Sequence, residues 1–373
     1  MPSQLTNYQC PACTGPLRYD GASGKLCCDY CGSSFSVQEI EALYKDKLEQ
    51  AEQAGVQQAA AATQQSSGES WDWDAAGSDW GSDAAGMKSY SCPSCGAELI
   101  CDATTAATSC PYCGNPTVVP VQFHGGLKPD FILPFKLSKD DAVKALKEYY
   151  HGKKLLPKAF SDNNHIEEIK GVYVPFWLFD GIADADIRFD ASNVHVFRSG
   201  NERITRTDHF AVRRAGAVAF SQIPVDASTK MPDAHMDAIE PFDYSELKPF
   251  STAYMPGFLA DKYDIEARDC SDRADERAAN TAVNLIANTV TGYASCVPIS
   301  RDIRLRRGRV SYALLPVWLL STRWNNKSFL FAMNGQTGKL IGDLPVSSER
   351  YWSWFARIAL PVAAVIGLLL QFL

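Results

Sequence analysis

The chain has 373 residues, enough for two or three domains, and its hydrophobic content of 46% is that of an ordinary globular protein. The formal net charge is −7 at pH 7. This balance argues against broad non-specific binding to nucleic acid, which needs many lysines and arginines on phosphates, but leaves a local basic face open.

Cysteines are concentrated near the N-terminus: ten of the twelve lie within the first 113 residues. The opening stretch "MPSQLTNYQC" has neither the basic start nor the apolar run of a signal peptide. We therefore expect a reducing compartment, in which closely spaced cysteines bind metal rather than form disulfides.

Two segments repeat one cysteine pattern. In both, two Cys-x-x-Cys pairs are separated by fourteen residues, the first pair reads Cys-Pro-x-Cys, and the second reads Cys-x-Tyr-Cys-Gly. The eight cysteines in this register are Cys10, Cys13, Cys28 and Cys31 in the first segment, and Cys92, Cys95, Cys110 and Cys113 in the second. The pattern predicts small rubredoxin-like zinc ribbons at residues 1–36 and 88–120. Cys27 and Cys101 fall outside the register.

Four thiolates around one ion make a closed tetrahedral site with no position for substrate or water. The sequence therefore predicts two structural zinc ions. Metal binding of this kind contributes on the order of 10–16 kcal/mol, which a segment too short for its own core requires. Charged residues in the first ribbon cancel, and the second carries a net charge of −1. This favours protein contact over nucleic acid contact.

Residues 37–64 are rich in Ala, Gln and Glu and are predicted to be helical, with Ser36 and Glu39 forming a capping box. Residues 65–87 are rich in Gly, Ser and acids and predict a disordered linker. Two interpretations of this linker stay open. It is a solvated tether, or it is a linear motif that binds a partner through Trp71, Trp73 and Trp80.

The remaining body contains an internal repeat. The stretches "YVPFWLFD" (173–180) and "LLPVWLLS" (314–321) share Pro and Trp at matching positions, and predicted helices at 138–150 and 271–289 precede them. We infer a β-rich, duplicated α+β body with modules at 121–260 and 261–350. Large apolar residues on both faces predict strands covered on both sides, and the internal prolines suggest edge or strand-start positions.

No catalytic motif is found in the body. The six histidines form no metal-ligand pair at helical spacing, and phosphate-binding loops and nucleophile motifs are lacking. The Arg-rich stretch 198–214 is interpreted as a solvated sheet face. The sequence therefore predicts a protein that is not an enzyme and identifies no small-molecule substrate; a pocket with convergent polar groups would reopen the question.

Residues 351–373 end the chain in a hydrophobic segment. Residues 352–373 would be about 33 Å long as a helix, which spans a hydrocarbon core of about 30 Å. Arg350 and Arg357 lie on the N-terminal side of the apolar run. These features predict a transmembrane tail anchor, a single-pass location in the cell membrane and a cytoplasmic body.

The paired cysteine segments, "KPDFILPFKL", "KGVYVPFWLFD", "YALLPVWLL" and "MNGQTGKLIGDLP" resemble a family of bacterial transcription-factor-IIB-type zinc-ribbon-containing membrane proteins. Some members carry labels that suggest a primosomal helicase, replication factor Y. The resemblance implies zinc at the eight cysteines, a β-rich body and a hydrophobic C-terminus, without an established activity. The chain has no ATPase motif that would support the helicase label.

The sequence as a whole predicts an α+β protein with two zinc ribbons, a duplicated body and one C-terminal transmembrane helix. The expected function is that of a non-enzymatic, membrane-tethered zinc-binding adaptor or scaffold that contacts a cytoplasmic protein partner. The alternative is a nucleic-acid-associated zinc-ribbon factor of transcription or replication.

Overall fold

The computed structural model describes residues 10–12, 17–21, 23–28, 31–43, 70–103, 105–107, 109–121, 126–158, 160, 166–200, 202–325 and 327–370. Cys13, residues 44–64 of the predicted helix and residues 65–69 of the predicted linker lie outside this part of the chain.

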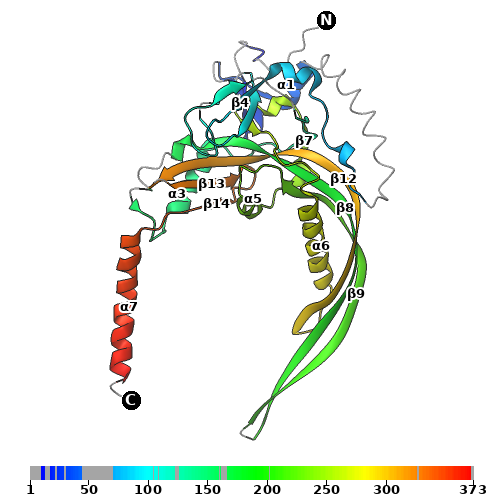
Figure 1. The fold of residues 1–373 in the computed structure, drawn as a ribbon, viewed down its shortest axis with the longest axis vertical. Coiled ribbons are helices and arrows are strands. Elements are labelled where there is room, and N and C mark those ends of the chain that lie inside the picture. The colour runs from blue at the N-terminus through cyan, green and yellow to red at the C-terminus, as the bar shows by residue number, and fades with distance from the viewer. Residues whose placement is uncertain are drawn as a thin grey trace.

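Strands dominate the described chain (Figure 1). A small sheet is formed by β1 (Leu17–Asp20), β2 (Lys25–Cys28) and β3 (Ser34–Ser36). The other strands belong to one 11-stranded sheet: β4 (Met87–Ser91), β5 (Glu98–Asp102), β6 (Val119–Val121), β7 (Phe131–Ile132), β8 (Lys170–Ser199), β9 (Glu202–Asp226), β10 (Lys248–Pro249), β11 (Leu259–Asp261), β12 (Ser295–Trp324), β13 (Lys327–Asn334) and β14 (Leu340–Gly342).

Helices cover the sheet and extend from it. The α-helices are α1 (Val37–Leu43), α3 (Lys139–Tyr150), α5 (Asp233–Ile239), α6 (Ser271–Ala287) and α7 (Ser348–Leu370). Short 3₁₀ helices are η2 (Trp73–Ala75), η3 (Gly81–Gly86), η4 (Ile166–Glu168), η5 (Tyr244–Glu246) and η6 (Thr252–Tyr254). The capping box predicted before α1 is confirmed: the Ser36 backbone N–H donates to Glu39, and the Glu39 backbone N–H donates to the Ser36 hydroxyl.

The centre of the large sheet is the antiparallel pair β8 and β12, which contain the two Pro-Trp stretches. Val174 and Leu315, which hold equivalent positions in the two repeats, lie directly opposite each other. Residues 171–179 and 310–320 are almost all buried, so both faces of these strands are covered, as predicted. The two repeats therefore meet about a local two-fold axis at the middle of the sheet.

The first strand of each repeat pairs with the long strand of the other repeat. β7 runs parallel to β12, with Ile132 opposite Leu314, and β11 runs parallel to β8, with Ala260 opposite Tyr173. Leu314 and Tyr173 are again equivalent positions. This exchange makes one continuous body, and the boundary expected between residues 260 and 261 falls inside β11.

The repeated tryptophans make the same contacts in both halves. The indole Nε1 of Trp177 donates to the carbonyl oxygen of Ile265 at 2.9 Å, and that of Trp318 donates to the carbonyl oxygen of Leu137 at 3.2 Å. An aromatic ring two residues before each acceptor packs edge-on against the indole, Tyr263 on Trp177 and Phe135 on Trp318. Each indole therefore anchors the segment that precedes the helix of the opposite repeat.

The prolines of the two stretches lie inside central strands, not at the edge or strand-start positions that the sequence suggests. Pro175 lies between the end of the β11 pairing at Tyr173 and the start of the β9 pairing at Phe176. Its carbonyl oxygen accepts from Ala227 on this outer side, so the proline nitrogen faces the same side. Proline has no N–H to donate, and at Pro175 this leaves no hydrogen bond unmade, because β11 has ended there and β9 has not yet begun. Pro316 lies in the same way between the end of the β7 pairing and the start of the β13 pairing.

Beyond the body, β8, β9 and the first half of β12 continue as a long curved arm (Figure 1). One face carries apolar residues such as Ile187 and Phe189, which pack against Val283 and Ile286 of α6. The other face carries ion pairs, including Arg306 with Asp184 and Arg213 with Asp186. Carboxylates of the arm therefore neutralise part of this face, Arg206 and Arg213 among the arginines of the stretch 198–214.

The part of the predicted linker that the structure describes is not a solvated tether. Trp71 and Trp80 are buried, and their rings pack edge-on against Phe179 and Phe250. Trp73 is half-buried and packs against the same core. Burial of the large apolar indole surfaces lowers the free energy by more than desolvation of the polar neighbours raises it. Residues 70–86 therefore lie against the sheet instead of extending into solvent.

The predicted transmembrane helix is wrong, and so is the single-pass membrane location inferred from it. Within the described residues, no helix combines the length and the apolar character needed to cross a bilayer. The segment forms α7, which projects from the body (Figure 1). Its strictly apolar part, residues 358–370, would be about 20 Å long, short of the roughly 30 Å of a hydrocarbon core.

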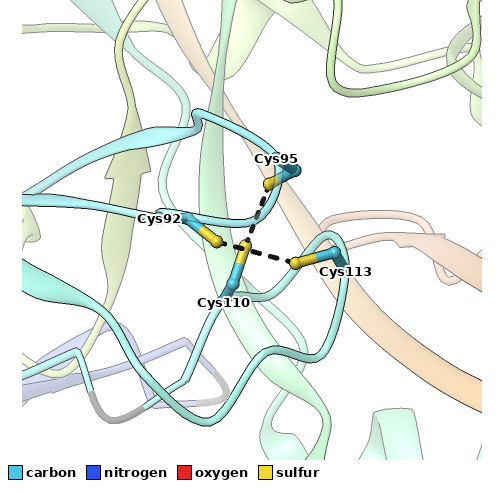
Figure 2. A group of neighbouring side chains, drawn as sticks. All are labelled: Cys92, Cys95, Cys110 and Cys113. Atoms are coloured by element: carbon cyan, nitrogen blue, oxygen red, sulfur yellow. Dashed lines mark hydrogen bonds between the residues drawn. The ribbon is translucent and has the colours of Figure 1, made fainter.

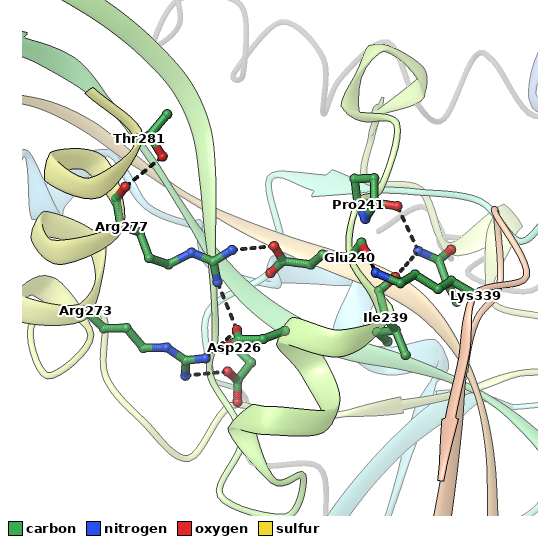
Figure 3. A network of polar contacts seen from close by, with 10 residues as sticks. Asp226, Ile239, Glu240, Pro241, Arg273, Arg277, Thr281 and Lys339 are labelled. Atoms are coloured by element: carbon green, nitrogen blue, oxygen red, sulfur yellow. Dashed lines mark hydrogen bonds and ion pairs between the residues drawn. The ribbon is translucent and has the colours of Figure 1, made fainter. Parts of the chain in front are cut away.

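A polar network ties α6 to α5 and to the end of β9 (Figure 3). Arg273 donates to the buried Asp226 at 2.8 Å and to Asp237 at 2.6 Å, and Arg277 pairs with Glu240. Burial raises the pKa of Asp226 to about 6 against the opposing effect of Arg273. The network holds both helices on one end of the sheet.

Asp261, at the end of β11, is a second buried carboxyl group and accepts from the Ser228 hydroxyl at 2.6 Å. Burial raises its pKa to about 7, partly offset by that hydrogen bond. Between about pH 4 and pH 7 the folded protein keeps a proton that the unfolded chain has lost. Its contribution to the free energy of unfolding therefore falls as the pH rises through this range.

We predict that Asp261→Asn flattens this dependence and raises the free energy of unfolding above pH 7 by on the order of 2–4 kcal/mol, because the amide does not ionise. Urea denaturation of the variant and the parent between pH 5 and pH 8 measures the difference. Asp302→Asn, at an exposed position of the arm, is the control and should leave the profile unchanged. If the free energy of unfolding depended on pH in the same way in Asp261→Asn and the parent, a raised pKa of Asp261 would be contradicted.

A steric prediction follows from Gly171 at the start of β8. A Cβ atom there would lie 2.5 Å from a ring carbon of Phe258. We expect Gly171→Ala to lower the free energy of unfolding by about 1–3 kcal/mol through overpacking. Gly216→Ala, on β9 with nothing within 4 Å of the added atom, should change it by less than about 0.5 kcal/mol. Equal effects in urea denaturation would contradict this reading.

Candidate metal centres

Four cysteines of the second ribbon converge on one point (Figure 2). The sulfur atoms of Cys92, Cys95, Cys110 and Cys113 all lie within 4.8 Å of one another. The Cys92–Cys113 and Cys95–Cys110 sulfur distances are both 3.6 Å. These separations are far too long for disulfide bonds, and the cysteines of the described residues are free thiols. The four sulfurs form a compact donor set.

Glycine turns position these sulfurs. Gly96 has φ of +71° and its N–H donates to the carbonyl oxygen of Cys92; Gly114 has φ of +68° and donates to that of Cys110. Gly32 repeats the turn in the first ribbon with φ of +73° and a bond to Cys28. This left-handed conformation favours glycine, and it turns the chain tightly enough for both cysteines of a pair to face one point.

Burial and nearby N–H groups set the protonation of the thiols. Burial raises the pKa of Cys95 to about 11 and also raises that of Cys110. At Cys92 the effect of burial is outweighed by the backbone N–H groups of Cys95 and Ser94, and its pKa falls to about 7. Four adjacent thiolates repel one another, so a cation among them is needed for all four to ionise together.

The first ribbon brings together Cys10, Cys28 and Cys31, again within 4.8 Å. The Cys10–Cys31 sulfur distance is 3.6 Å, and Ser33 lies beside Cys31, with its hydroxyl oxygen 3.3 Å from the sulfur. Cys13, the fourth predicted ligand, lies outside the described residues. Each ribbon therefore presents a cysteine cluster placed to hold a metal ion.

The donor geometry fits a tetrahedral metal site. A zinc ion with four sulfurs at about 2.3 Å implies sulfur–sulfur distances of about 3.8 Å, close to the 3.6 Å found in both clusters. Thiolates are soft ligands that select zinc and similar metals. With four cysteines bound, no position remains for substrate, so such an ion would act by holding the chain together.

Both clusters are fused to the body. In the first ribbon, the ring of Tyr19 packs edge-on against Tyr254, and its backbone N–H donates to Pro256. The second ribbon contributes β5 to the large sheet, where Leu99 pairs with Asp261 of β11. The clusters therefore lie at the junctions between ribbons and body.

Some contacts around the clusters were not found from sequence. The ammonium of Lys170, at the start of β8, donates to the carbonyl oxygen of Ser109 at 2.8 Å and to its hydroxyl, directly before Cys110. Asn115 places its amide 3.9 Å from the Cys92 sulfur. Asn115 directly follows Gly114, so its place beside the cluster could have been predicted from the sequence. Lys170 is sixty residues from Cys110 in sequence, and only the fold brings it to this site.

The cysteines outside the repeated register and the three tryptophans of the predicted linker lie outside the two clusters. Cys101 is buried in the second ribbon, and its thiol donates to the carbonyl oxygen of Thr105 rather than joining the cluster. Cys27 is half-buried and outside the first cluster. Trp71, Trp73 and Trp80 pack with the body instead of forming a common exposed surface.

The chain is similar to "Uncharacterized protein YdjG" of Bacillus subtilis (strain 168), with 34% identity over 320 residues. The match covers 73% of this chain and 94% of the relative. No family model and no solved structure matches the chain.

We predict that freshly purified, reduced protein contains two metal ions per chain, measured by inductively coupled plasma mass spectrometry. Cys110→Ser should remove one ion and lower the melting temperature, because a ligand of the second cluster is lost. Cys101→Ser, a change of the same type within the same ribbon, should retain both ions. Two ions in Cys110→Ser, or one ion in Cys101→Ser, would contradict the ligand assignment.

Proposed function

The chain belongs to the family of the Bacillus subtilis protein YdjG, and for it we propose a non-enzymatic scaffold that binds a protein partner. In this proposal two zinc ions hold both ribbons against the body, and the long arm presents the partner-binding surface. Paired ribbons are also the feature by which the sequence resembles the transcription-factor-IIB-type zinc-ribbon proteins.

The observation that carries the proposal is the end of the arm. β12 stops pairing with β8 at Ser192, so residues 193–199 of β8 and residues 202–208 of β9 continue as a two-stranded hairpin. Val194, Val196 and Phe197 are each about half exposed there, and Ile204 is exposed as well. An isolated hairpin is marginally stable in water, and apolar groups on it gain from being covered by another protein.

Charge indicates the character of that partner. Arg198 and Arg203 are cross-strand neighbours at the hairpin end. Like charges directly opposite each other on a sheet are destabilising. Among the described residues, no carboxylate pairs with either side chain. A partner with an apolar patch bordered by acidic residues would cover the exposed valines and neutralise both guanidinium groups.

The closed metal sites support a scaffold rather than a catalyst. A four-cysteine ion offers no open position for substrate, and the clusters lie where the ribbons join the body. In this role the ions would hold the ribbons rigidly on the body, while the arm would contact the partner protein. The metal sites would thus stabilise the body, and the arm would bind the partner.

The test uses a photo-crosslinking amino acid at Phe197 in the full-length protein, expressed in the cells that naturally contain it. We expect a specific protein adduct, identified by mass spectrometry. Reversing the charge in Arg198→Glu together with Arg203→Glu should reduce its yield at least about tenfold, because acidic groups would then face acidic groups.

Arg304→Glu is the matched control, since this residue is highly exposed and lies on the same arm nearer the body. It should leave the adduct unchanged. Absence of any protein adduct, or equal loss in the control, would refute the proposal. An adduct with nucleic acid in place of protein would favour a nucleic-acid-associated factor.

A further inference from the structure

A pocket lies where both ribbons meet the body, and neither the metal sites nor the arm accounts for it. Its volume is about 270 Å³. The walls come from residues 18–21 of the first ribbon, residues 105–107 of the second, the start of α3 and the start of β8. A cavity bordered by segments so far apart in sequence exists only when the ribbons are docked.

The charged residues that line this pocket are mostly basic. Arg18, Lys139 and Lys170 contribute three cations from three separate segments, against the single carboxylate of Asp20. Lys170 uses two of its three N–H donors on Ser109, and within the described residues the third has no acceptor. The pocket therefore has an excess of positive charge and an available donor.

Two carboxylates on the same segments as these cations accept hydrogen bonds from neighbouring serines. Asp20 accepts from the backbone N–H of Ser23 at 3.3 Å and from its hydroxyl at 2.6 Å. Asp141, in the first turn of α3, accepts from the backbone N–H and the hydroxyl of Ser138. Both carboxylates thus take part in the turn after β1 and in the cap of α3. Burial lowers the pKa of Lys170, and Glu168, two residues before it, partly opposes this lowering.

The rest of the lining is apolar. Trp318 and Phe258, both buried, form part of the wall, and Leu137 and Ile169 border it. Aromatic surface combined with a few convergent charged groups is the usual construction of a small-molecule site. Such a lining suits a ligand with one charged end and one apolar end.

We propose that this pocket binds a small organic anion, with its carboxylate or phosphate at Arg18, Lys139 and Lys170 and its apolar part against Trp318 and Phe258. Bound there, the anion would contact both ribbons and the body at once. The ligand would thereby favour the docked arrangement. This inference does not rest on the protein-partner proposal.

The test titrates three probes into the full-length protein by isothermal calorimetry: phenyl phosphate, benzoate and the neutral benzyl alcohol. We expect at least one anion to bind about tenfold more tightly than the alcohol, since hydrogen bonds to charged groups contribute more than neutral ones. The stronger of the two anions identifies the head group that the site prefers.

Arg18→Gln and Lys139→Gln, both at exposed positions, should each weaken the preferred anion about fivefold or more. Lys147→Gln removes the same charge from the last turn of α3, outside the pocket, and should change affinity less than about twofold. Equal binding of the alcohol, equal weakening by Lys147→Gln, or no binding of any probe at millimolar concentration would overturn the proposal.

Discussion

The pairing of β8 with β12 is the constraint on which the other parts of this protein depend. It sets Val174 opposite Leu315 and thereby puts two copies of one strand–helix–strand–strand unit about a local axis. The outer edges of the pair then accept β7 and β11 from the opposite units. Because each unit supplies a strand to the other, neither could be removed without leaving unpaired backbone groups in the core.

The ribbons are joined to this centre through buried contacts, which changes how their metal sites are understood. Tyr19 of the first ribbon packs on Tyr254, and β5 of the second ribbon extends the sheet beside β11. A metal ion held by either cluster would stabilise the relative placement of that ribbon and the body. The same placement encloses the basic pocket, so the cysteine clusters and the pocket depend on one arrangement of the chain.

Local patterns predicted the parts of the structure that local geometry controls. Cysteine spacing and the repeated Cys-x-Tyr-Cys-Gly pattern identified the two clusters, and Ser36 with Glu39 marked the capping box before α1. Composition was a weaker guide. The acidic, Gly-rich composition of residues 65–87 predicts a disordered linker, either a tether or a partner-binding motif, yet Trp71 and Trp80 are buried. The apolar tail predicts a membrane span, but among the described residues no helix has both the length and the hydrophobicity that crossing a bilayer requires.

The sequence by itself determined where cysteines cluster, where helices begin and which stretches repeat, because these depend on neighbours within a few residues along the chain. Tertiary structure alone decided that the repeats exchange strands, that Pro175 and Pro316 lie at changes of the neighbouring strand, and that Lys170 comes to Ser109. Those arrangements join residues tens or hundreds of positions apart. Their free energy comes from pairing and burial across the fold, which no local pattern of residues encodes.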